Sequence, residues 1–486
     1  MITALLILIP FLFGLLCFAL PGKSASKIAF ESSILTFIGG IAAFYFFSKG
    51  QVELLEYSLP WIPSLGINFH VDMDGISLLL VMLTVFLTPL ILLSSQSKAY
   101  SQSSNFNGLV LIMQAALIGV FTAKDAFAFY MFWELALIPI YFIALIWGGE
   151  NRKAVTFKFF LYTTIGSLLM LASLLYLYTK TPNGSFSLVD LYQIPLSASE
   201  QTFVFLGFFL AFAIKMPIFP FHTWQPDTYT TAPTEGTMLL SGIMLKMGVY
   251  GVIRFILPIT PIAVLEWGWL VILLAVIGIV YTSIIALKQN HFKRMIAYVS
   301  IAHVGLMAAG LFTVNAEALQ GVIIQMLAHG INVVGMFYIV DLISRKCNTD
   351  QMDSLGGLRN QAPILSAFFL IILMANVALP LTNGFVGEYL LIVGLFQHSP
   401  WMAAVAALTI IFGAAYMLNA YQKIMLGAKQ DKFNHVEDVN AKDLMVLIPI
   451  TIMIIVMGVY PKLFLDISAP SVKEILNAFH QGNTLN

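Results

Sequence analysis

The sequence Ala213-Ile-Lys215-Met-Pro217-Ile-Phe-Pro220 places a lysine and two prolines at the end of a long apolar run. Proline removes a backbone donor and clashes with the preceding turn, so a helix through this run must kink or open. At membrane depth, open backbone is tolerated only where protein buries it or where it lines a wet cavity. The stretch therefore predicts a broken helix inside a bundle of membrane helices.

The composition of the chain indicates that lipid covers most of its surface. Hydrophobic residues make up 59% of the 486 residues and charged residues only 10%. Soluble globular chains carry roughly 25% charged residues, which is what a water-facing surface needs. The net charge is zero, so nucleic acid is not a predicted partner. Cys17 and Cys347 are too few and too isolated for a disulfide framework, a zinc site or an iron–sulfur cluster.

Windows of about 19 residues predict about fourteen membrane helices and no sizeable soluble domain. The first apolar run has no preceding Lys or Arg and no clear cleavage pattern after it, so we expect a retained helix rather than a signal peptide. The fold class is an all-α integral membrane protein. The predicted spans are 2–20, 28–48, 76–95, 108–123, 126–147, 154–179, 203–219, 233–256, 265–287, 294–313, 316–343, 362–397, 401–424 and 444–466.

The distribution of basic residues predicts how these helices are oriented. Lys and Arg gather in short cytoplasmic loops, and every predicted loop is shorter than about 60 residues. Of the 24 basic residues, sixteen lie in or beside odd-numbered loops and six on the other side, while Lys215 and Lys246 lie inside spans. Both termini are therefore expected on the outer side of the membrane.

A second interruption lies in the twelfth predicted span, at Asn376-Val-Ala-Leu-Pro380-Leu-Thr-Asn383-Gly384. The two breaks are five spans apart, so they have opposite orientations. This relation is typical of an inverted-topology repeat, with functional sites near the broken helices. We expect one polytopic domain, 1–486, made of N-terminal helices (1–107), a first repeat (108–256), a second repeat (265–424) and a C-terminal helix and tail (444–486).

Glu134 lies in the apolar stretch Phe-Tyr-Met-Phe-Trp133-Glu134-Leu of the fifth span. A charge at the centre of a membrane helix costs about 2.5–3.5 kcal/mol on insertion scales, so this carboxylate needs a partner. Lys215 on the seventh span is the expected partner. A purely structural ion pair is the alternative, but ionisable groups inside a membrane are functional by default.

Lys246 lies deep in the eighth span, within Leu-Leu-Ser241-Gly-Ile-Met-Leu-Lys246-Met-Gly248. Burial disfavours the charged form of lysine, so such an amine can exchange a proton near neutral pH. A side chain that reaches back to the membrane surface is the alternative, but the depth of Lys246 makes this difficult. We expect a proton relay.

Three histidines, His222, His303 and His329, lie in or beside spans, where imidazole can pass protons near physiological pH. For each of them alone, a hydrogen bond between helices is an equally good interpretation. Gln325 and His329 are four residues apart, so they share a helix face and could hold water together. Haem ligation is not predicted, because these histidines lie on separate spans.

Glu388 follows the second break, in Asn383-Gly-Phe-Val-Gly387-Glu388-Tyr. The deep groups alternate in preferred charge along the chain, which predicts proton translocation. No His, Cys or Asp cluster has the spacing of metal ligands, and two lysines would repel a cation, so no metal is expected. In chain order the deep groups are Glu134, Lys215, Lys246, His303, His329 and Glu388.

Several of these segments resemble the antiporter-like subunits of respiratory complex I, in the right order and over nearly the whole chain. The segments are Asp74-Gly-Ile-Ser77, 213–227, 232–236, 293–305 and Gly384-Phe-Val-Gly-Glu388-Tyr. Fourteen spans with outward termini also fit the family. The resemblance implies that a glutamate at position 388 marks one branch, whereas sister subunits and Mrp-type antiporter subunits tend to have lysine or another group there.

The resemblance implies a proton-translocating subunit of NADH:quinone oxidoreductase that carries no redox centre itself. Flavin, iron–sulfur clusters and quinone would belong to other chains, so no cofactor is expected here. Glu134 would govern how tightly Lys215 holds its proton, Lys246 would be the central relay, and Glu388 would lead to the exit. His222, His303 and His329 would support a water-linked path. The implied partners are the lipid bilayer and other membrane subunits of complex I, with sister antiporter-like chains on both sides.

Two other functions stay open from the sequence. A subunit of an Mrp-type multisubunit Na+/H+ antiporter would share the motifs and the helix count, and Glu388 is the residue that argues against it. A purely structural membrane scaffold would not explain ionisable groups at mid-depth in several spans. The expected location is the inner (plasma) membrane of a bacterial cell, which the outward N-terminus favours over an organellar membrane.

Overall fold

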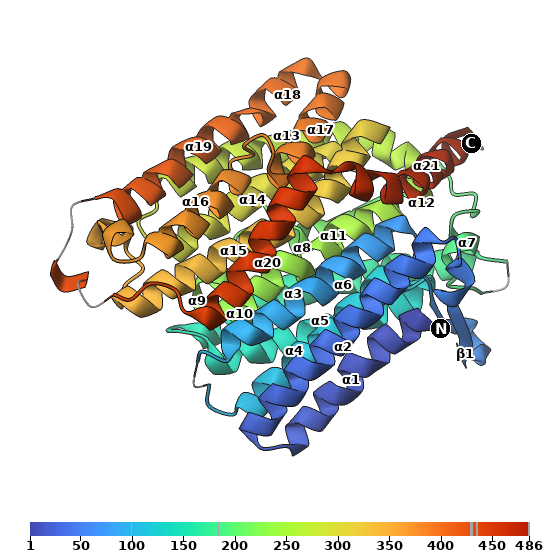
Figure 1. Ribbon diagram of the computed structural model, residues 1–486. Helices are drawn as coiled ribbons and strands as arrows, with labels where there is room; N and C mark the ends of the chain where they lie inside the picture. The colour runs from blue at the N-terminus through green and yellow to red at the C-terminus, as the bar shows by residue number, and fades with distance from the viewer. Residues whose placement is uncertain (99, 183, 428–430, 434–435, 485–486) are drawn as a thin grey trace. The chain divides into compact units, whose positions relative to one another are not determined.

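The structure is a computed structural model that describes residues 1–98, 100–182, 184–427, 431–433 and 436–484 (Figure 1). The chain divides into two compact units. Unit 1 comprises Met1–Met216, Ile243–Trp269 and Asp466–Asn486, and unit 2 comprises Pro217–Gly242 and Leu270–Leu465. The predicted repeats at 108–256 and 265–424 follow a different division and stay a prediction.

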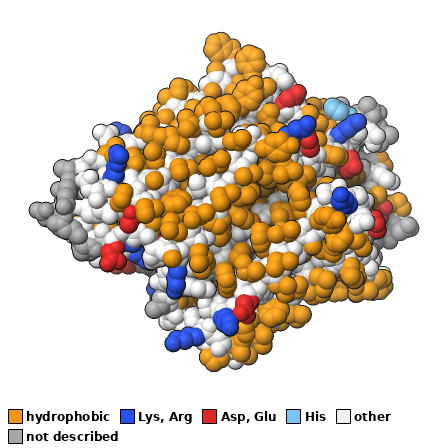
Figure 2. All heavy atoms as spheres, in the orientation of Figure 1, with side chains coloured by type: hydrophobic (Ala, Val, Ile, Leu, Met, Phe, Trp, Pro, Cys, Tyr) orange, Lys and Arg blue, Asp and Glu red, His pale blue; other side chains and the backbone are white. Residues whose placement is uncertain are grey.

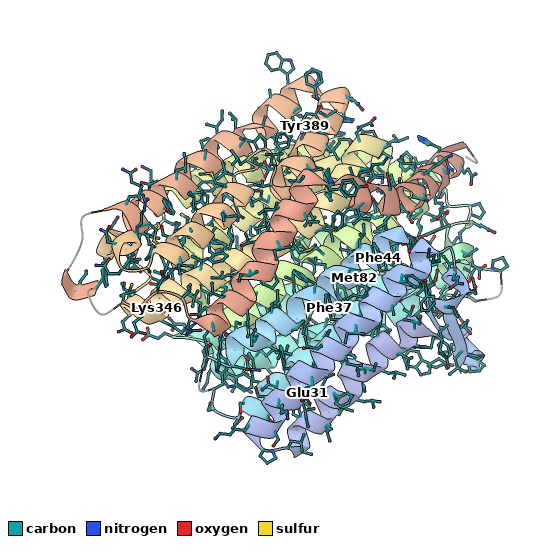
Figure 3. All side chains as sticks on the ribbon, in the orientation of Figure 1. Glu31, Phe37, Phe44, Met82, Lys346 and Tyr389 are labelled. Atoms are coloured by element: carbon teal, nitrogen blue, oxygen red, sulfur yellow. The ribbon has the colours of Figure 1, made fainter. Side chains whose placement is uncertain are left out.

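Unit 1 is built mainly from long apolar helices. In it α1 packs against α2 and α4, and α6 packs against α8. Figure 3 labels Phe37 and Phe44 on α2 and Met82 on α3, two helices that also pack together. The rings of Phe37 and Phe86 are 6.3 Å apart across this contact. The helices are α1 (Ile2–Ala19), α2 (Gly22–Ser48), α3 (Gly75–Ser95), α4 (Ser103–Thr122), α5 (Ala126–Trp147), α6 (Arg152–Lys180), α7 (Leu188–Leu191), α8 (Ala198–Lys215), α11 (Lys246–Gly251) and α12 (Leu257–Ile259).

In unit 2, α15 packs against α14, α16, α17 and α20. It is fully buried over its apolar window, so its polar residues face other protein segments rather than lipid. The helices of unit 2 are α9 (Gln225–Thr231), α10 (Thr234–Leu239), α14 (Phe292–Leu311), α15 (Ala316–Cys347), α16 (Pro363–Asn376), α17 (Asn383–His398), α18 (Pro400–Ala406), α19 (Leu408–Tyr421) and α20 (Ala441–Val459). Two further helices, α13 (Pro261–Lys288) and α21 (Lys462–Thr484), cross the division between the units in sequence.

Both predicted interruptions are confirmed. Helix α8 ends at Lys215, and the chain runs through turns before α9 begins at Gln225. Helix α16 ends at Asn376, and α17 begins at Asn383. Prolines in each gap remove backbone donors and prevent the helix from continuing.

A third interruption, in the span Thr234–Ile259, was not predicted. Two π-helical segments, η3 (Leu240–Met244) and η4 (Val252–Ile256), flank the short helix α11. Such turns are rare and occur frequently at functional sites. Lys246, the first residue of α11, therefore lies between two π-helical segments in a span that is wholly buried.

The ends of the spans hold structure that the hydropathy pattern did not predict. β1 (Tyr57–Ile62) pairs antiparallel with β2 (Ile67–Val71), with Tyr57 opposite Val71. The predicted span 444–466 is wrong at its end, because α20 stops at Val459. Pro461 disfavours helical backbone in the residue before it, so the helix ends and α21 begins at Lys462.

Among the described residues, thirteen helices are long and apolar enough to cross a membrane. Helices α16 and α17 together form one further, broken span. The expected all-α membrane fold of about fourteen spans is therefore confirmed. Figure 2 shows hydrophobic side chains over most of the visible face, with charged side chains in small groups, as lipid contact requires.

Gly248 sets how closely α11 approaches α8 within unit 1. A Cβ atom at this position would lie 2.9 Å from the carbonyl oxygen of Phe212 and 3.0 Å from the backbone nitrogen of Met216. Backbone atoms cannot rotate out of the way as the end of a side chain can. Glycine therefore allows the helix that ends at Lys215 to pack against the helix that begins at Lys246.

We expect Gly248→Ala to lower the thermal stability of the detergent-purified protein. Overpacking costs about 1–3 kcal/mol, whereas alanine gains only about 1 kcal/mol in helix propensity. Unfolding can be followed with a thiol-reactive dye, because Cys17 and Cys347 are both buried. In the matched control Gly413→Ala on α19, the nearest atom to the new Cβ is the Tyr416 hydroxyl at 3.6 Å, so stability should be unchanged or higher. Equal stability of the two variants would contradict the tight contact at Gly248.

Candidate functional site

Lys215 is buried at the C-terminal end of α8, with 3% of its surface exposed. Its Nζ lies 5.1 Å from the centre of the Trp133 ring and has no hydrogen-bond partner among the described residues. The face of an indole ring attracts an ammonium, most strongly where water is excluded. The C-terminus of a helix also favours a cation. These two features stabilise the ammonium without a direct counter-ion.

Glu134 follows Trp133 on α5 and is half-buried. Its Oε1 is buried and, like the Nζ of Lys215, has no hydrogen-bond partner among the described residues. The direct Glu134–Lys215 pair that the sequence suggested is therefore not formed in the described structure, because the indole ring takes the place beside the ammonium. Charges in a low-dielectric interior still interact without contact.

Lys246 is fully buried, with 0% of its surface exposed. It lies on α11, which packs against α8 where Gly248 permits close approach. Unit 1 therefore holds two buried amines on two adjacent helices. The sequence predicted both residues, and the structure places them on neighbouring elements.

Unit 2 brings His303 and Glu388 into contact. Nδ1 of His303 on α14 lies 3.0 Å from Oε1 of Glu388 on α17, and the two side chains are 5% and 2% exposed. The separation is that of an ion pair, although the angle is not that of a hydrogen bond. Because histidine is charged only when protonated, this contact changes strength when a proton arrives or leaves.

His329 on α15 extends the same cluster. Its ring centre lies 5.9 Å from that of His303, and its Nε2 lies 3.0 Å from the Oγ of Ser300. Gln325, one turn earlier on α15, lies against Gly387, where a Cβ atom would collide with its side chain. Four of the residues that the sequence singled out, His303, Gln325, His329 and Glu388, thus lie on three helices that pack together.

Buried amides in unit 2 were missed by the sequence analysis as site residues. Asn332 on α15 donates to the carbonyl of Ala375 at 3.2 Å, and its Oδ1 has no partner among the described residues. Both side-chain polar atoms of Asn383 are in the same condition. Buried polar atoms that make no hydrogen bond to protein are where proteins hold ordered water. An asparagine inside an apolar span is the sequence feature that could have indicated these residues.

His222 has a different setting from the other two histidines. Its ring lies 5.7 Å from that of Phe219 and 5.6 Å from that of Tyr281, and the side chain is buried. The structure thus places two aromatic rings beside it. Among the described residues, no group of three or more His, Cys, Asp or Glu has the arrangement of a metal site.

Two family models match the chain. One, described as NADH:quinone oxidoreductase/Mrp antiporter, TM, matches residues 123–413, and the other, NADH-ubiquinone oxidoreductase chain 4, amino terminus, matches residues 1–122. Among curated proteins, NADH-quinone oxidoreductase subunit M of Rickettsia conorii is 39% identical over 96% of each chain. NADH-ubiquinone oxidoreductase chain 4 of Marchantia polymorpha is 35% identical over 97% of this chain and 96% of that one.

The solved structures that the chain resembles include respiratory complex I from Thermus thermophilus with bound NADH. One chain of that structure matches with a TM-score of 0.91 and 31% identity, over 99% of this chain and 100% of that chain. A chain of the Mrp complex from Dietzia sp. DQ12-45-1b matches with a TM-score of 0.86 and 18% identity, over 99% of this chain and 52% of that chain. At that identity, the second match shows the fold alone.

We expect Trp133→Leu to destabilise the purified protein more than Trp133→Phe, because phenylalanine keeps a ring face beside the ammonium. A desolvated cation–ring contact is worth about 2 kcal/mol. Thermal unfolding of both variants should also be measured in a Lys215→Met background, where the leucine variant should lose less stability. Trp269→Leu on the exposed surface of α13 is the control for loss of an indole. If Trp133→Leu and Trp133→Phe differ in stability by the same amount in the Lys215→Met background, Trp133 acts through packing alone.

Proposed function

This chain belongs to the family of NADH-quinone oxidoreductase subunit M and NADH-ubiquinone oxidoreductase chain 4, and we propose that its buried Glu, Lys and His side chains carry the protons that such a subunit translocates. It is a multi-pass membrane subunit of a multisubunit respiratory complex. The Mrp-type antiporter is less well supported, because the match over residues 1–122 is to chain 4. The single observation that carries the proposal is the buried His303–Glu388 contact, with its reversible charge.

In unit 1, the proposed acceptor of an incoming proton is Lys215. Trp133 and the C-terminus of α8 stabilise its ammonium form, and the charge of Glu134 adds to this across the ring. When Glu134 is neutralised or turned away, the ammonium loses part of its stabilisation and releases its proton. Lys246, on the adjacent helix, is the proposed next acceptor within the unit.

In unit 2, the proposed carriers are His329, His303 and Glu388. A proton on His303 makes the contact with Glu388 an ion pair, and its transfer to Oε1 leaves a neutral imidazole beside a neutral carboxyl group. Ser300 holds the ring of His329 at 3.0 Å and so fixes how it faces the path. We propose that Glu388 releases the proton toward the exit and that His222 supports the path.

We propose that quinone reduction in other subunits supplies the energy for proton translocation. The flavin, iron–sulfur and quinone chemistry would take place in those subunits. Moving one charge against 100 mV costs about 2.3 kcal/mol, so each step needs only a modest change in the affinity for protons. The proposed neighbours are sister antiporter-like chains on both sides in the membrane plane. Glu134 lies on a helix face that also exposes Met131 and Ile138, so we propose that a change of charge in such a neighbouring chain acts on its carboxylate.

We expect Lys246→Met and Glu388→Gln to reduce NADH-driven proton pumping several-fold in proteoliposomes of the complete complex, because each variant removes a group that must gain and lose a proton. Glu388→Asp keeps a carboxylate and should retain part of the activity. Glu266→Gln, an exposed glutamate on α13, is the matched control and should pump normally. Native proton-to-electron stoichiometry in a fully assembled Glu388→Gln complex would refute the proposed role of this residue.

We expect both termini and the hairpin β1–β2 on the outer side of the membrane. A cysteine at Ser58 on β1 should react with a membrane-impermeant maleimide in intact cells, and a cysteine at Glu150 should react only after lysis. Both positions are exposed, whereas the native Cys17 and Cys347 are buried and give little background. Labelling of position 150 in intact cells would reverse the proposed orientation.

A further inference from the structure

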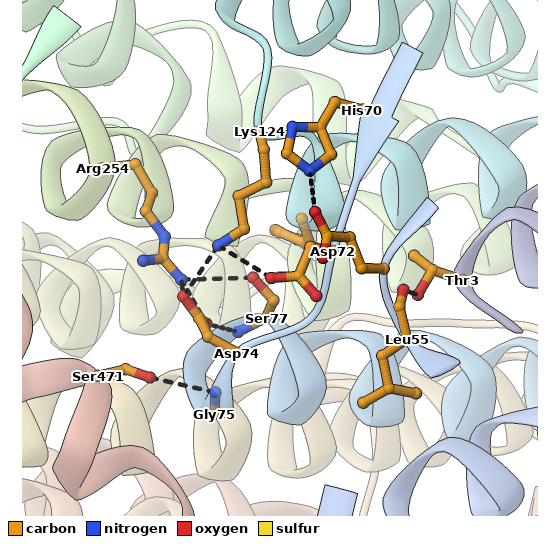
Figure 4. A network of polar contacts seen from close by, with 12 residues as sticks. Thr3, Leu55, His70, Asp72, Asp74, Gly75, Ser77, Lys124, Arg254 and Ser471 are labelled. Carbon is orange, nitrogen blue, oxygen red and sulfur yellow. Dashed lines mark hydrogen bonds and ion pairs between the residues drawn. The ribbon is translucent and has the colours of Figure 1, made fainter. Parts of the chain in front are cut away.

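A polar cluster lies at the end of unit 1 that carries the hairpin β1–β2 (Figure 4). Here Asp72 donates its backbone N–H to the carbonyl of Thr122 at 2.9 Å, and Val71 forms a bridge with Ala123. Asp74 caps α3 by accepting from the backbone N–H of Ser77 at 3.0 Å. We call Asp72, Asp74, Lys124 and Arg254, with Ser77 and Tyr250, the hairpin-end cluster.

The four charged members of this cluster are two cations and two carboxylates. One guanidinium nitrogen of Arg254 contacts both carboxylate oxygens of Asp74. Lys124 lies 3.3 Å from Asp74 and 3.8 Å from Asp72. The Arg254 side chain is only 6% exposed, so the ion pair closes the buried side of the cluster, whereas Lys124 at 21% reaches its exposed side.

Asp74 stays ionised at every physiological pH. Burial by itself would raise its pKa, but the charges of Arg254 and Lys124 and the hydrogen bond from Ser77 together hold the pKa well below the ordinary value. Arginine does not release its proton in proteins. The Asp74–Arg254 pair is therefore a fixed pair of charges, unlike the titratable groups proposed to carry protons.

Hydrogen bonds continue inward from Arg254 in one direction. Arg254 donates to the Oγ of Ser77 at 3.3 Å, and Ser77 contacts the hydroxyl of Tyr250 at 3.1 Å. Tyr250 donates its single proton to the backbone carbonyl of Phe121 at 2.9 Å. Ser77 must therefore donate to Tyr250, and every donor in the chain points the same way.

Such a chain cannot relay a proton. Its first member, Arg254, has no acceptor, and its last member, the carbonyl of Phe121, has no proton to pass on. A proton moving outward through Tyr250 would need its hydroxyl to turn away from Phe121 and would then meet a fixed positive charge. Fixed arginine charges exclude protons and cations in membrane pores by the same barrier.

The position of the chain relates it to Lys246. Tyr250 follows Lys246 by four residues on α11, which places both on one face of the helix. Arg254 follows by a further four residues on η4, and Tyr192 donates to its backbone carbonyl at 2.8 Å. The guanidinium also lies 5.1 Å from the centre of the Tyr250 ring. The cluster thus occupies the part of unit 1 between Lys246 and the hairpin end.

We infer that the hairpin-end cluster is a proton-tight closure, which prevents Lys246 from exchanging protons directly with the side of the membrane that the hairpin faces. The inference rests on the proposed role of Lys246 in proton transfer. A closure of this kind makes translocation directional, because a relay lysine open to both sides would leak. Arg254 maintains it, because it has no acceptor, whereas the Tyr250 hydroxyl is the link through which a proton would pass if Arg254 were replaced by a group that also accepts.

The test measures passive proton entry into proteoliposomes of the complete complex, without NADH, driven by a potassium diffusion potential. Arg254→Gln replaces a pure donor with a side chain that both donates and accepts, so the conductance should rise several-fold. Arg254→Met cannot relay a proton and should leak less. Adding Tyr250→Phe to Arg254→Gln removes the hydroxyl link and should restore tightness. The control is Arg294→Gln, in a half-exposed Arg294–Asp227 pair of 3.0 Å.

Native tightness of Arg254→Gln overturns the closure. Equal leaks in Arg254→Gln and Arg254→Met that Tyr250→Phe does not reverse also overturn it, because they indicate lost packing alone. If Arg254→Gln does not assemble, Arg254→Lys is the variant to measure. Lysine keeps the positive charge but can lose its proton, so a small leak is expected, and native tightness would contradict the closure. The passive leak is measured without NADH turnover, so it tests the closure by itself. The proposed function is tested separately by NADH-driven pumping, and normal pumping by Lys246→Met would reject it.

Discussion

A charged side chain at the centre of a membrane helix costs about 2.5–3.5 kcal/mol on insertion scales, and this cost decides which side chains of the chain have to be buried. Lys215, Lys246, His303 and Glu388 are all buried in protein, and Glu134 is half-buried. Burying them requires spans that are themselves buried over their apolar length, such as Thr234–Ile259 and α15.

The break after α8 offsets part of this cost locally. Lys215 is the last residue of α8, where the partial negative charge of the helix terminus favours an ammonium. Glu388 is the sixth residue of α17, beyond the first turn in which the charge of the other terminus acts. An unbroken helix would not give Lys215 a terminus inside the membrane, so the prolines after α8 contribute to its electrostatic environment.

The sequence predicted what depends on local pattern and missed what depends on helix rotation and distant contacts. Proline positions and apolar lengths were enough for the spans and the breaks, and burial cost was enough to single out the ionisable groups. The placement of Trp133 beside Lys215 depends on how α5 and α8 are turned, which hydropathy does not record. The π-helical segments around Lys246 shift hydrogen bonds by one residue without changing the apolar pattern.

The Asp74–Arg254 pair was the hardest feature to predict, because 180 residues separate its members. In the sequence, Arg254 was only one of the basic residues near the ends of spans, and Asp74 was only part of a segment that resembles the family. Their chemistry nevertheless follows a simple division. In the proposed function, the side chains that carry protons are lysine, histidine and glutamate, each of which can gain and lose a proton. The proposed closure rests instead on arginine, which keeps its proton. The buried span Thr234–Ile259 holds both Lys246 and Arg254, so the proposed relay and the proposed closure lie on one element.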